Sequence, residues 1–400
     1  MKNLFSLTLC LSLLSSNTSV DQYLSPYVGA DLIESTTEGL ISFEDALKPE
    51  ADGTVQQIGA GVYRIGTLLF FWGPLGFLEN LIQHEVFGHG YRVRSFKKWQ
   101  YEVVGYSFFS DSSTVYTEFL YPQKTNQVLY NTVVSGGTEA QTLLAMHLRE
   151  SFFEKGFQDG RWTLTYNMAN LGLANYIHDY ARLENEKKSA PEGHDIDQYL
   201  ITINQLNPQN PVSIKQLESM ATLTLLDPFF WNQIVSFWTY ALFGKELPTP
   251  VMTWNTFRFI PSLSPNLTPF GPEIIFEQYY SIGTTPFKTY FRYTPFNKRG
   301  NYGAGYKNHY IWNYSDLHIG AQVDVWVAPK LAPLGQDQPP FTKESRLRPG
   351  ISGLITFRQT VGSFERFKAG LDLGYKTQGY LIGAPVQKGV VGSVSATFEF

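Results

Sequence analysis

Two histidines and a glutamate stand close together in the segment His84-Glu85-Val86-Phe87-Gly88-His89. Imidazole nitrogens are common zinc ligands, and a glutamate beside one of them can take a proton from a metal-bound water. The usual form of such a site is a helix with histidines at positions i and i+4 and a glutamate after the first. The residue types therefore predict a metal centre that activates water.

The spacing between the two histidines is one residue longer than in that usual form. Five steps of about 100° place His84 and His89 about 140° apart on a regular α-helix, too far round to share one ion easily. One extra residue in a turn returns position i+5 to the face of position i. Gly88 is the residue best able to tolerate such a bulge. The motif therefore predicts a local bulge in its helix.

The segment resembles the His-Glu-x-x-Gly-His motif of the dipeptidyl-peptidase III family of zinc peptidases. That family also has a glycine after the second histidine, matched here by Gly90, and a third ligand, a glutamate, some fifty residues further on. Glu139 stands 50 residues after His89, in a predicted helix. The resemblance implies that His84, His89 and Glu139 bind Zn²⁺ and that Glu85 is the base. It covers these positions alone, and the family's Glu-Glu-Cys-Arg-like context around its third ligand is absent.

Other polar side chains leave the set of ligands open. Glu150 lies on nearly the same predicted helical face as Glu139 and is the alternative ligand, and His147 lies about 80° from Glu139 on that helix. His178 could donate to an oxyanion or bind the metal, and a surface or capping role is its alternative. The alternative for the two motif histidines is that they have no functional role. The motif ends an apolar helix, however, where imidazoles without a polar partner would be costly to bury.

The first residues of the chain predict export. Lys2 supplies a positive charge, residues 4–14 are almost wholly apolar, and residues 15–19 are small and polar, as in a secretory signal peptide. The apolar run is too short to span a bilayer. Cys10 is the only cysteine, and its neighbours Leu9 and Leu11 do not suit lipid attachment. We therefore expect a signal peptide over residues 1–19. Because the single cysteine lies within it, the ligands of any metal site should be His, Asp and Glu.

The remaining chain changes its pattern at the two prolines of residues 246–250, which predict the end of a helix. Residues 20–250 carry helical patterns, including a helical stretch over 55–94 with a break at Gly73-Pro74. A hairpin is predicted over residues 100–121, and it could offer an edge strand to an extended peptide. Residues 251–400 instead alternate apolar and polar side chains with a period of two, as residues 316–327 illustrate.

This alternation predicts an α+β protein, in which a mainly helical, zincin-like part over residues 20–250 precedes an antiparallel β-barrel or sheet of about eight strands over residues 251–400. Charged residues make up 16 % of the chain and aromatic residues another 16 %, and the last alternating strand closes on Phe400. These features are typical of outer-membrane barrels. A periplasmic β-sandwich and a sheet packed on the helices are the alternatives.

We therefore expect an exported zinc-dependent hydrolase, by preference a metallopeptidase acting on a peptide or protein in the cell envelope, at the outer membrane or in the periplasm. The net charge of −4 indicates no general affinity for nucleic acid. Two rival interpretations remain. One is a non-enzymatic outer-membrane protein, such as a pore, an adhesin or a structural metal-binding protein. The other is a soluble periplasmic hydrolase with a β-sandwich appendage.

Overall fold

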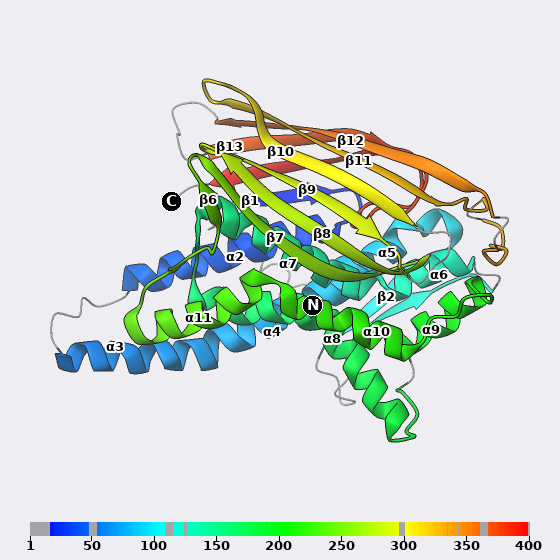
Figure 1. Cartoon of the computed structure of the whole chain (residues 1–400), viewed down its shortest axis with the longest axis horizontal. Helices are drawn as coiled ribbons and strands as arrows, with labels where there is room; N and C mark the ends of the chain where they lie inside the picture. Colours follow the sequence, from blue (N-terminus) through cyan, green and yellow to red (C-terminus); the bar gives the residue numbers. More distant parts are fainter. Residues whose placement is uncertain are drawn as a thin grey trace.

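A large curved antiparallel sheet lies over a layer of helices (Figure 1). The computed structural model describes residues 17–47, 54–108, 115–123, 126–191, 193–295, 301–333, 335–342, 345–360 and 367–398. Most of the expected signal peptide, the tip of the hairpin expected over 100–121, and Phe400 lie outside these residues. The expected α+β class is confirmed, with a mainly helical N-terminal part and an antiparallel sheet built mostly from later residues.

Ten strands form the sheet in the described part of the chain, in the order β1-β14-β13-β12-β11-β10-β9-β8-β7-β6. Except for β1, consecutive strands are neighbours, and every pair is antiparallel. The strands are β1 (Asn17–Asp21), β6 (Met252–Trp254), β7 (Phe257–Thr268), β8 (Gly271–Ile282), β9 (Thr285–Tyr293), β10 (Tyr302–Tyr314), β11 (Leu317–Pro329), β12 (Leu347–Thr360), β13 (Phe367–Lys376) and β14 (Gly389–Phe398).

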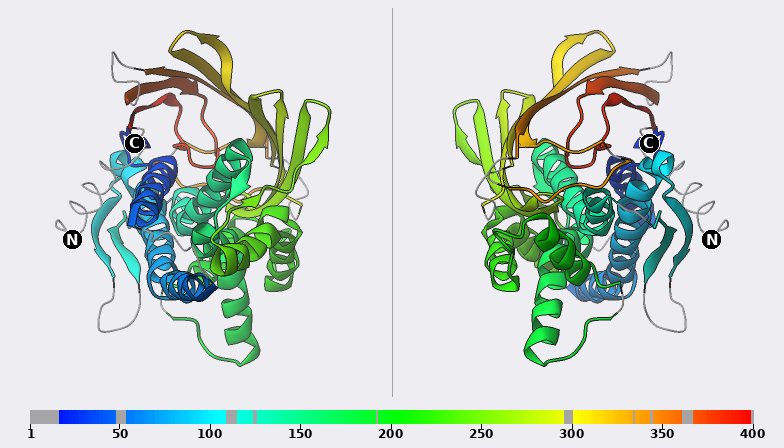
Figure 2. Two further views of the ribbon diagram at one scale, coloured as in Figure 1. Left: turned by 90° about the vertical axis from the view of Figure 1, so that its left-hand side faces the viewer. Right: turned by 90° about the vertical axis from the view of Figure 1, so that its right-hand side faces the viewer.

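The sheet is open in the described residues, so of the two expected forms, a barrel or a sheet, the structure has the sheet, and the preference for a membrane barrel is not confirmed. Its order ends at β1 on one side and at β6 on the other, and no pairing joins these two strands in the described residues. The pairing of β1 with β14 also places Asn17 to Ser19, the end of the expected signal segment, in the sheet. Helices, not further strands, face the concave side of the arc (Figure 2).

The helical layer carries the sequence motif. Its longer helices are α2 (Pro26–Leu47), α3 (Thr54–Thr67), α4 (Gly73–His84), α6 (Gln127–Val134), α7 (Gly136–Lys155), α8 (Thr163–Asn185), α9 (Asp195–Leu206), α10 (Ile214–Ala221) and α11 (Pro228–Phe243). Shorter elements are η1 (Leu68–Trp72), η2 (Glu85–His89), α5 (Gly90–Ser95), η3 (Lys97–Trp99), η4 (Gly160–Trp162) and η5 (Thr222–Leu226). Two small hairpins add β2 (Glu102–Ser107) with β3 (Tyr116–Leu120), and β4 (Phe157–Gln158) with β5 (Leu247–Pro248).

Residues 54–95 form one helical rod, built from α3, η1, α4, η2 and α5 in succession. The expected break at Gly73-Pro74 is absent, because the π-helix η1 precedes it and Gly73 N–H donates to the carbonyl of Leu68, five residues back. Pro74 then lies in the first turn of α4, where its missing N–H costs little. By length and composition, the stretch Gln56–Ser95 could cross a membrane, and 28 % of its most apolar window is buried.

Helix α7 lies beneath the concave face of the sheet and binds it through buried charges. Arg149 of α7 donates to Glu277 of β8 at 2.6 Å, and both side chains are fully buried. The segment between β13 and β14 also folds inward, where Tyr380 is fully buried and Gly383 N–H donates to Glu139 of α7 at 2.6 Å. The interior of the arc is therefore filled with protein.

Candidate metal centre

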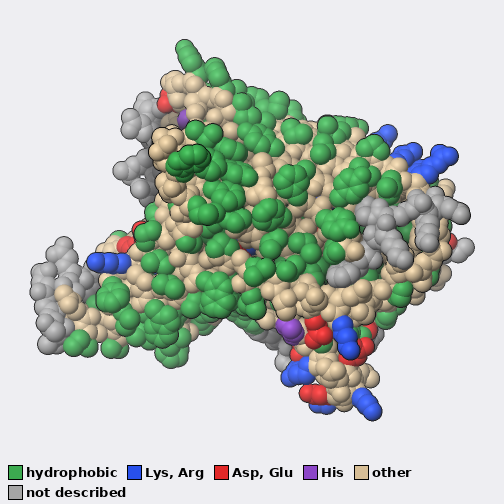
Figure 3. Space-filling view, viewed as in Figure 1, with side chains coloured by type: hydrophobic (Ala, Val, Ile, Leu, Met, Phe, Trp, Pro, Cys, Tyr) green, Lys and Arg blue, Asp and Glu red, His purple; other side chains and the backbone are tan. Residues whose placement is uncertain are grey.

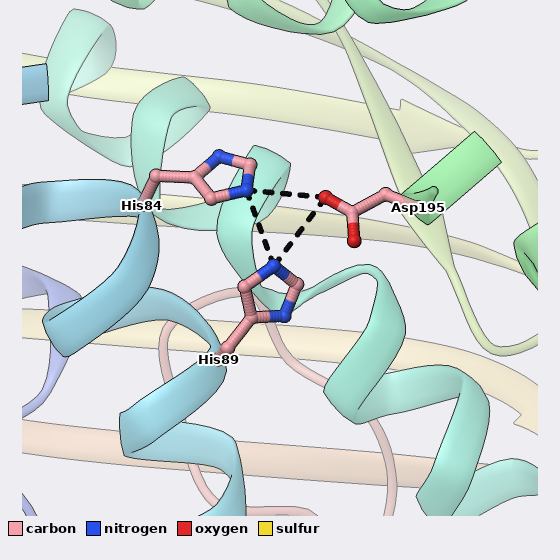
Figure 4. A group of neighbouring side chains, drawn as sticks. All are labelled: His84, His89 and Asp195. Atoms are coloured by element: carbon pink, nitrogen blue, oxygen red, sulfur yellow. Dashed lines mark hydrogen bonds and ion pairs between the residues drawn. The ribbon is translucent and has the colours of Figure 1, made fainter. Parts of the chain in front are cut away.

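Three side chains from distant parts of the chain converge on one point (Figure 4). His84 Nε2 lies 3.1 Å from His89 Nε2 and 3.1 Å from Asp195 Oδ2. His89 Nε2 lies 3.3 Å from the same Asp195 oxygen. The two histidines come from α4 and η2, and the aspartate is the first residue of α9. The three ligand atoms therefore form a nearly equilateral triangle.

The predicted bulge between the histidines is confirmed as a π-helical turn. Residues 85–89 form η2, and Gly90 N–H donates to the carbonyl of Glu85, five residues back. A π-turn holds one residue more than an α-turn, so the side chains of His84 and His89 return to the same face. The extra residue in the motif is thus absorbed by the backbone.

The hydrogen bonds of the outer ring nitrogens fix how the two imidazoles face the point of convergence. His89 Nδ1 lies 2.7 Å from the carbonyl oxygen of Val133, which can only accept, so Nδ1 carries the hydrogen. His84 Nδ1 lies 3.2 Å from Gln141 Oε1 and donates in the same way. Metal-binding histidines usually have such partners, which leave the Nε2 lone pair free for the ion.

Three acceptor atoms thus face one another without a donor between them, an arrangement that calls for a cation. A proton is the simplest one. Burial would lower the pKa of His89, but the Asp195 carboxylate raises it to about 9. Burial opposes ionisation of Asp195, while the charge of His89 holds the pKa of that carboxyl well below its usual range.

A zinc ion also fits the triangle. Tetrahedral zinc with bonds of about 2.0–2.1 Å has ligand–ligand edges of about 3.3–3.4 Å, and the observed separations are 3.1–3.3 Å. Two imidazoles and one carboxylate form a common catalytic zinc set, with the fourth position left for water or substrate. The side chains of His89 and Asp195 are 10 % and 13 % exposed, so the cluster is not sealed from solvent.

Gly88 and Gly137 allow the motif to approach α7 closely. A Cβ on Gly88 would lie 2.6 Å from the carbonyl oxygen of Gly136, and a Cβ on Gly137 would lie 2.3 Å from His84 Nε2. The sequence analysis singled out Gly88 because glycine tolerates a bulge. The structure gives a further reason, because only glycine leaves room for this close contact between the two backbones. The imidazole of His84 lies directly against the N-terminal turn of α7.

Glu85 lies beside the cluster without belonging to it. Its side chain is buried, and Glu85 Oε2 accepts a hydrogen bond of 2.7 Å from the hydroxyl of Thr117 on β3. Its charge contributes to the raised pKa of His89. The expected base is thus a buried carboxylate close to the cluster of His84, His89 and Asp195, held by the hairpin that the sequence predicts.

Tyr176 of α8 covers the other side of His84. The two rings stack with centroids 5.1 Å apart and planes 11° apart, and the Tyr176 hydroxyl lies 3.5 Å from His84 Nε2. Burial and the nearby charge of Asp195 raise the pKa of Tyr176, so its hydroxyl keeps its hydrogen. Tyr176 offers a donor next to the point of convergence.

Glu139, the expected third ligand, is held elsewhere. It forms a buried ion pair with Arg92, in which both of its oxygens accept from the guanidinium, and one also accepts from Gly383 N–H. The cluster's carboxylate is Asp195 instead. The likeness to the dipeptidyl-peptidase III motif is thereby confined to the segment 84–90, because Asp195 does not match that family's glutamate.

The remaining candidates also have other partners. Glu150 lies 2.8 Å from His309 and 2.9 Å from Lys307, and His147 lies 2.6 Å from Glu34. These pairs bind α7 to the sheet and to α2. The side chain of His178 is 57 % exposed and lies 3.9 Å from Glu218. None of the three belongs to the cluster of His84, His89 and Asp195.

Comparison of the chain with models of protein families, with curated proteins and with solved structures found no match.

Proposed function

We propose that the protein is an exported zinc-dependent hydrolase in which His84, His89 and Asp195 hold the metal and Glu85 acts as the base. The observation that carries this proposal is the convergence of three acceptor atoms with a separate, buried carboxylate beside them. A zinc ion in this triangle would supply Lewis acidity, which polarises a carbonyl group and acidifies water. Glu85 would take the proton from the attacking water and deliver it to the leaving group.

Peptides are the substrate class that we propose, because an edge strand lies beside Glu85. In the described residues β3 pairs with β2 alone, and Thr117 of β3 donates to both the carbonyl and the carboxylate of Glu85. An extended peptide that adds to such an edge is fixed by main-chain hydrogen bonds, and its scissile bond would pass near the base. The likeness of the motif to that of zinc peptidases agrees with this choice.

The first experiment measures zinc in the purified chain by elemental analysis, in wild type and in the His84→Ala plus His89→Ala variant. We expect one zinc per wild-type chain and none in the variant. Equal zinc contents in the two proteins would refute the metal centre.

The second experiment separates catalysis from a purely structural metal. Glu85→Gln should keep the zinc and lower the hydrolysis of a peptide library by about 10²- to 10⁴-fold, the usual contribution of a general base. Glu186→Gln, an exposed position after α8 and away from the strand β3, is the matched control and should hydrolyse as wild type does. Unchanged hydrolysis by Glu85→Gln would exclude Glu85 as the base. A zinc-loaded wild type that hydrolyses no peptide would favour the structural role.

A further inference from the structure

The outer face of the sheet has the polarity that a protein interior usually has. One cross-strand row on this face consists of Phe276, Phe291, Ala304, Val325 and Ile351, which are paired from β8 to β12. The larger side chains in this row are 37–56 % exposed. An apolar row that crosses five strands is much more than the isolated apolar residues of an ordinary protein surface.

The inner face carries the charges. The adjacent row on that side includes Glu277 of β8, Asp324 of β11 and Lys376 of β13, which are 0 %, 2 % and 0 % exposed. Every Asp, Glu, Lys and Arg in β8–β14 occupies an inward position of the alternation. The sheet therefore turns its charged side toward α7 and its apolar side outward.

Aromatic side chains gather at both ends of the strands. Trp254, Trp312 and Tyr314 lie near the β6–β7 and β10–β11 turns, which share one end of the meander, and are 48–79 % exposed. Tyr293 and Tyr302 are paired at the opposite end and are 52 % and 49 % exposed. Tryptophan and tyrosine favour the boundary between the hydrocarbon and water of a membrane, where they flank its apolar core.

The exposed apolar surface continues onto helices beside the β6 edge of the sheet. Phe70 of η1 is 83 % exposed, and Val62 of α3 and Phe243 of α11 are 68 % and 67 % exposed. Arg64 of α3 donates to the carbonyl of Ala241 at 3.2 Å, which ties α3 to α11. Figure 3 shows hydrophobic side chains spread over the sheet and over these helices in one view.

We propose that the acyl chains of a lipid bilayer cover this surface, with the strands β8–β14 spanning the membrane and α3, η1 and α11 lying in it beside the open edge. Strands of β8–β14 have 9–14 residues, enough to cross a bilayer at the usual tilt of about 45°. A second copy of the chain fits this surface poorly. The face is convex (Figure 2), and two convex faces meet over a narrow area, whereas fluid lipid follows any curvature.

The lipid-facing surface has a physical consequence for the open sheet. Lipid cannot hydrogen-bond to free backbone groups, so a sheet in a bilayer must have its edges covered. At the β1 edge α2 follows directly in the chain, with Asp21 Oδ1 accepting from the N–H groups of Tyr23 and Ser25 in the connection. Toward the other edge α11 packs on the inner face of the sheet, through Phe229 against the buried Tyr279 of β8. Helices therefore lie near both ends of the strand order. This inference does not depend on the metal centre.

Site-directed spin labelling tests the surface directly, because Cys10→Ser gives a cysteine-free background. Single cysteines replace Val325 on the sheet, Phe70 on η1 and, as a water-exposed control, Glu186 after α8. The full chain is reconstituted into phosphatidylethanolamine–phosphatidylglycerol vesicles. We expect labels at positions 325 and 70 to collide more often with oxygen than with a water-soluble nickel chelate, and the label at 186 to show the reverse preference.

Two results of the labelling experiment would overturn the proposal. The first is a label at 325 as accessible to the nickel chelate as the label at 186. The second is a label at 325 shielded from both reagents, together with cross-linking between copies, which would mean that a second chain covers the sheet. If only the label at 70 were accessible to water, the result would contradict the placement of α3, η1 and α11 in the bilayer. Flotation of the unlabelled wild type with the same vesicles is the independent check, and wild type that stays with the soluble fraction would also contradict the proposal.

Discussion

The Nε2 atoms of His84 and His89 lie 3.1 Å apart, although five residues separate them along one helical rod. The π-turn η2 makes this distance possible, and the hydrogen bonds of the two Nδ1 atoms point both lone pairs inward. Asp195 adds a negative charge to the same point. The backbone irregularity, the tautomers and the third side chain together make a group that could hold one metal ion.

Asp195→Asn should abolish stoichiometric metal binding. The change keeps the size of the side chain but removes the charge that balances the ion, and we expect the zinc affinity to fall by more than about 100-fold, the upper range for the loss of an outer-sphere partner. Asp197→Asn, two residues further along α9, is the control and should keep wild-type affinity. Zinc titration against a competing chelator measures both. Equal affinities for the two variants would remove Asp195 from the site.

Gly137→Ala should damage the same site from the side of α7. The new methyl group would lie 2.3 Å from His84 Nε2, and the ring cannot retreat freely because Tyr176 stacks on it. We therefore expect zinc affinity to fall at least about tenfold, as when the support of a ligand is lost. Gly66→Ala in α3 is the matched control, since nothing lies within 4 Å of its Cβ position and alanine favours a helix. Wild-type affinity in Gly137→Ala would mean that the imidazole need not occupy its present position.

Two features were predicted correctly from the sequence, and both depend on local periodicity. The spacing of His84 and His89 demanded a bulge, and the structure has a π-turn there. The period of two after residue 250 predicted the strands and their apolar face. Both features are set by neighbouring residues along one element, so the number of residues per turn is enough to predict them.

The third side chain of the cluster and the open form of the sheet depend on tertiary contacts, which the periodicity of the sequence does not reveal. Asp195 lies within the segment 185–197, which resembles a charged loop, and it joins the two histidines only because α9 begins there, with His194 as its N-cap. Glu139 is a carboxylate in a helix next to the motif, as the third ligand was expected to be, but it forms a buried ion pair with Arg92. Alternation likewise gives one apolar face without saying whether the edge strands meet, which depends on the number and tilt of the strands.

Glu139→Gln should destabilise the fold while leaving the metal centre intact. Arg92 would keep its charge, fully buried, without the carboxylate that balances it. Breaking a buried pair in this way costs about 3–5 kcal/mol of unfolding free energy. Chemical denaturation measures the loss, and zinc content per folded chain should stay at the wild-type value. Asp179→Asn, which breaks the exposed pair with Arg182, is the control and should change stability little. Loss of zinc from folded Glu139→Gln would instead restore Glu139 as a ligand.

Glu79 of α4 should make stability depend on pH. Burial raises the pKa of this carboxyl to about 7, although hydrogen bonds from Thr37 and Thr165 oppose the rise. In the unfolded chain its pKa is near the ordinary 4.5. The folded state therefore holds the proton more tightly, and this group's contribution to stability, complete below about pH 4.5, is lost as the pH rises through 7. The loss is up to about 3 kcal/mol. Glu79→Gln has no such proton, so its stability relative to wild type should be greater at pH 8 than at pH 4.5. Denaturation of both proteins at the two pH values measures the difference, and an equal difference at both would show that Glu79 titrates normally in the folded protein.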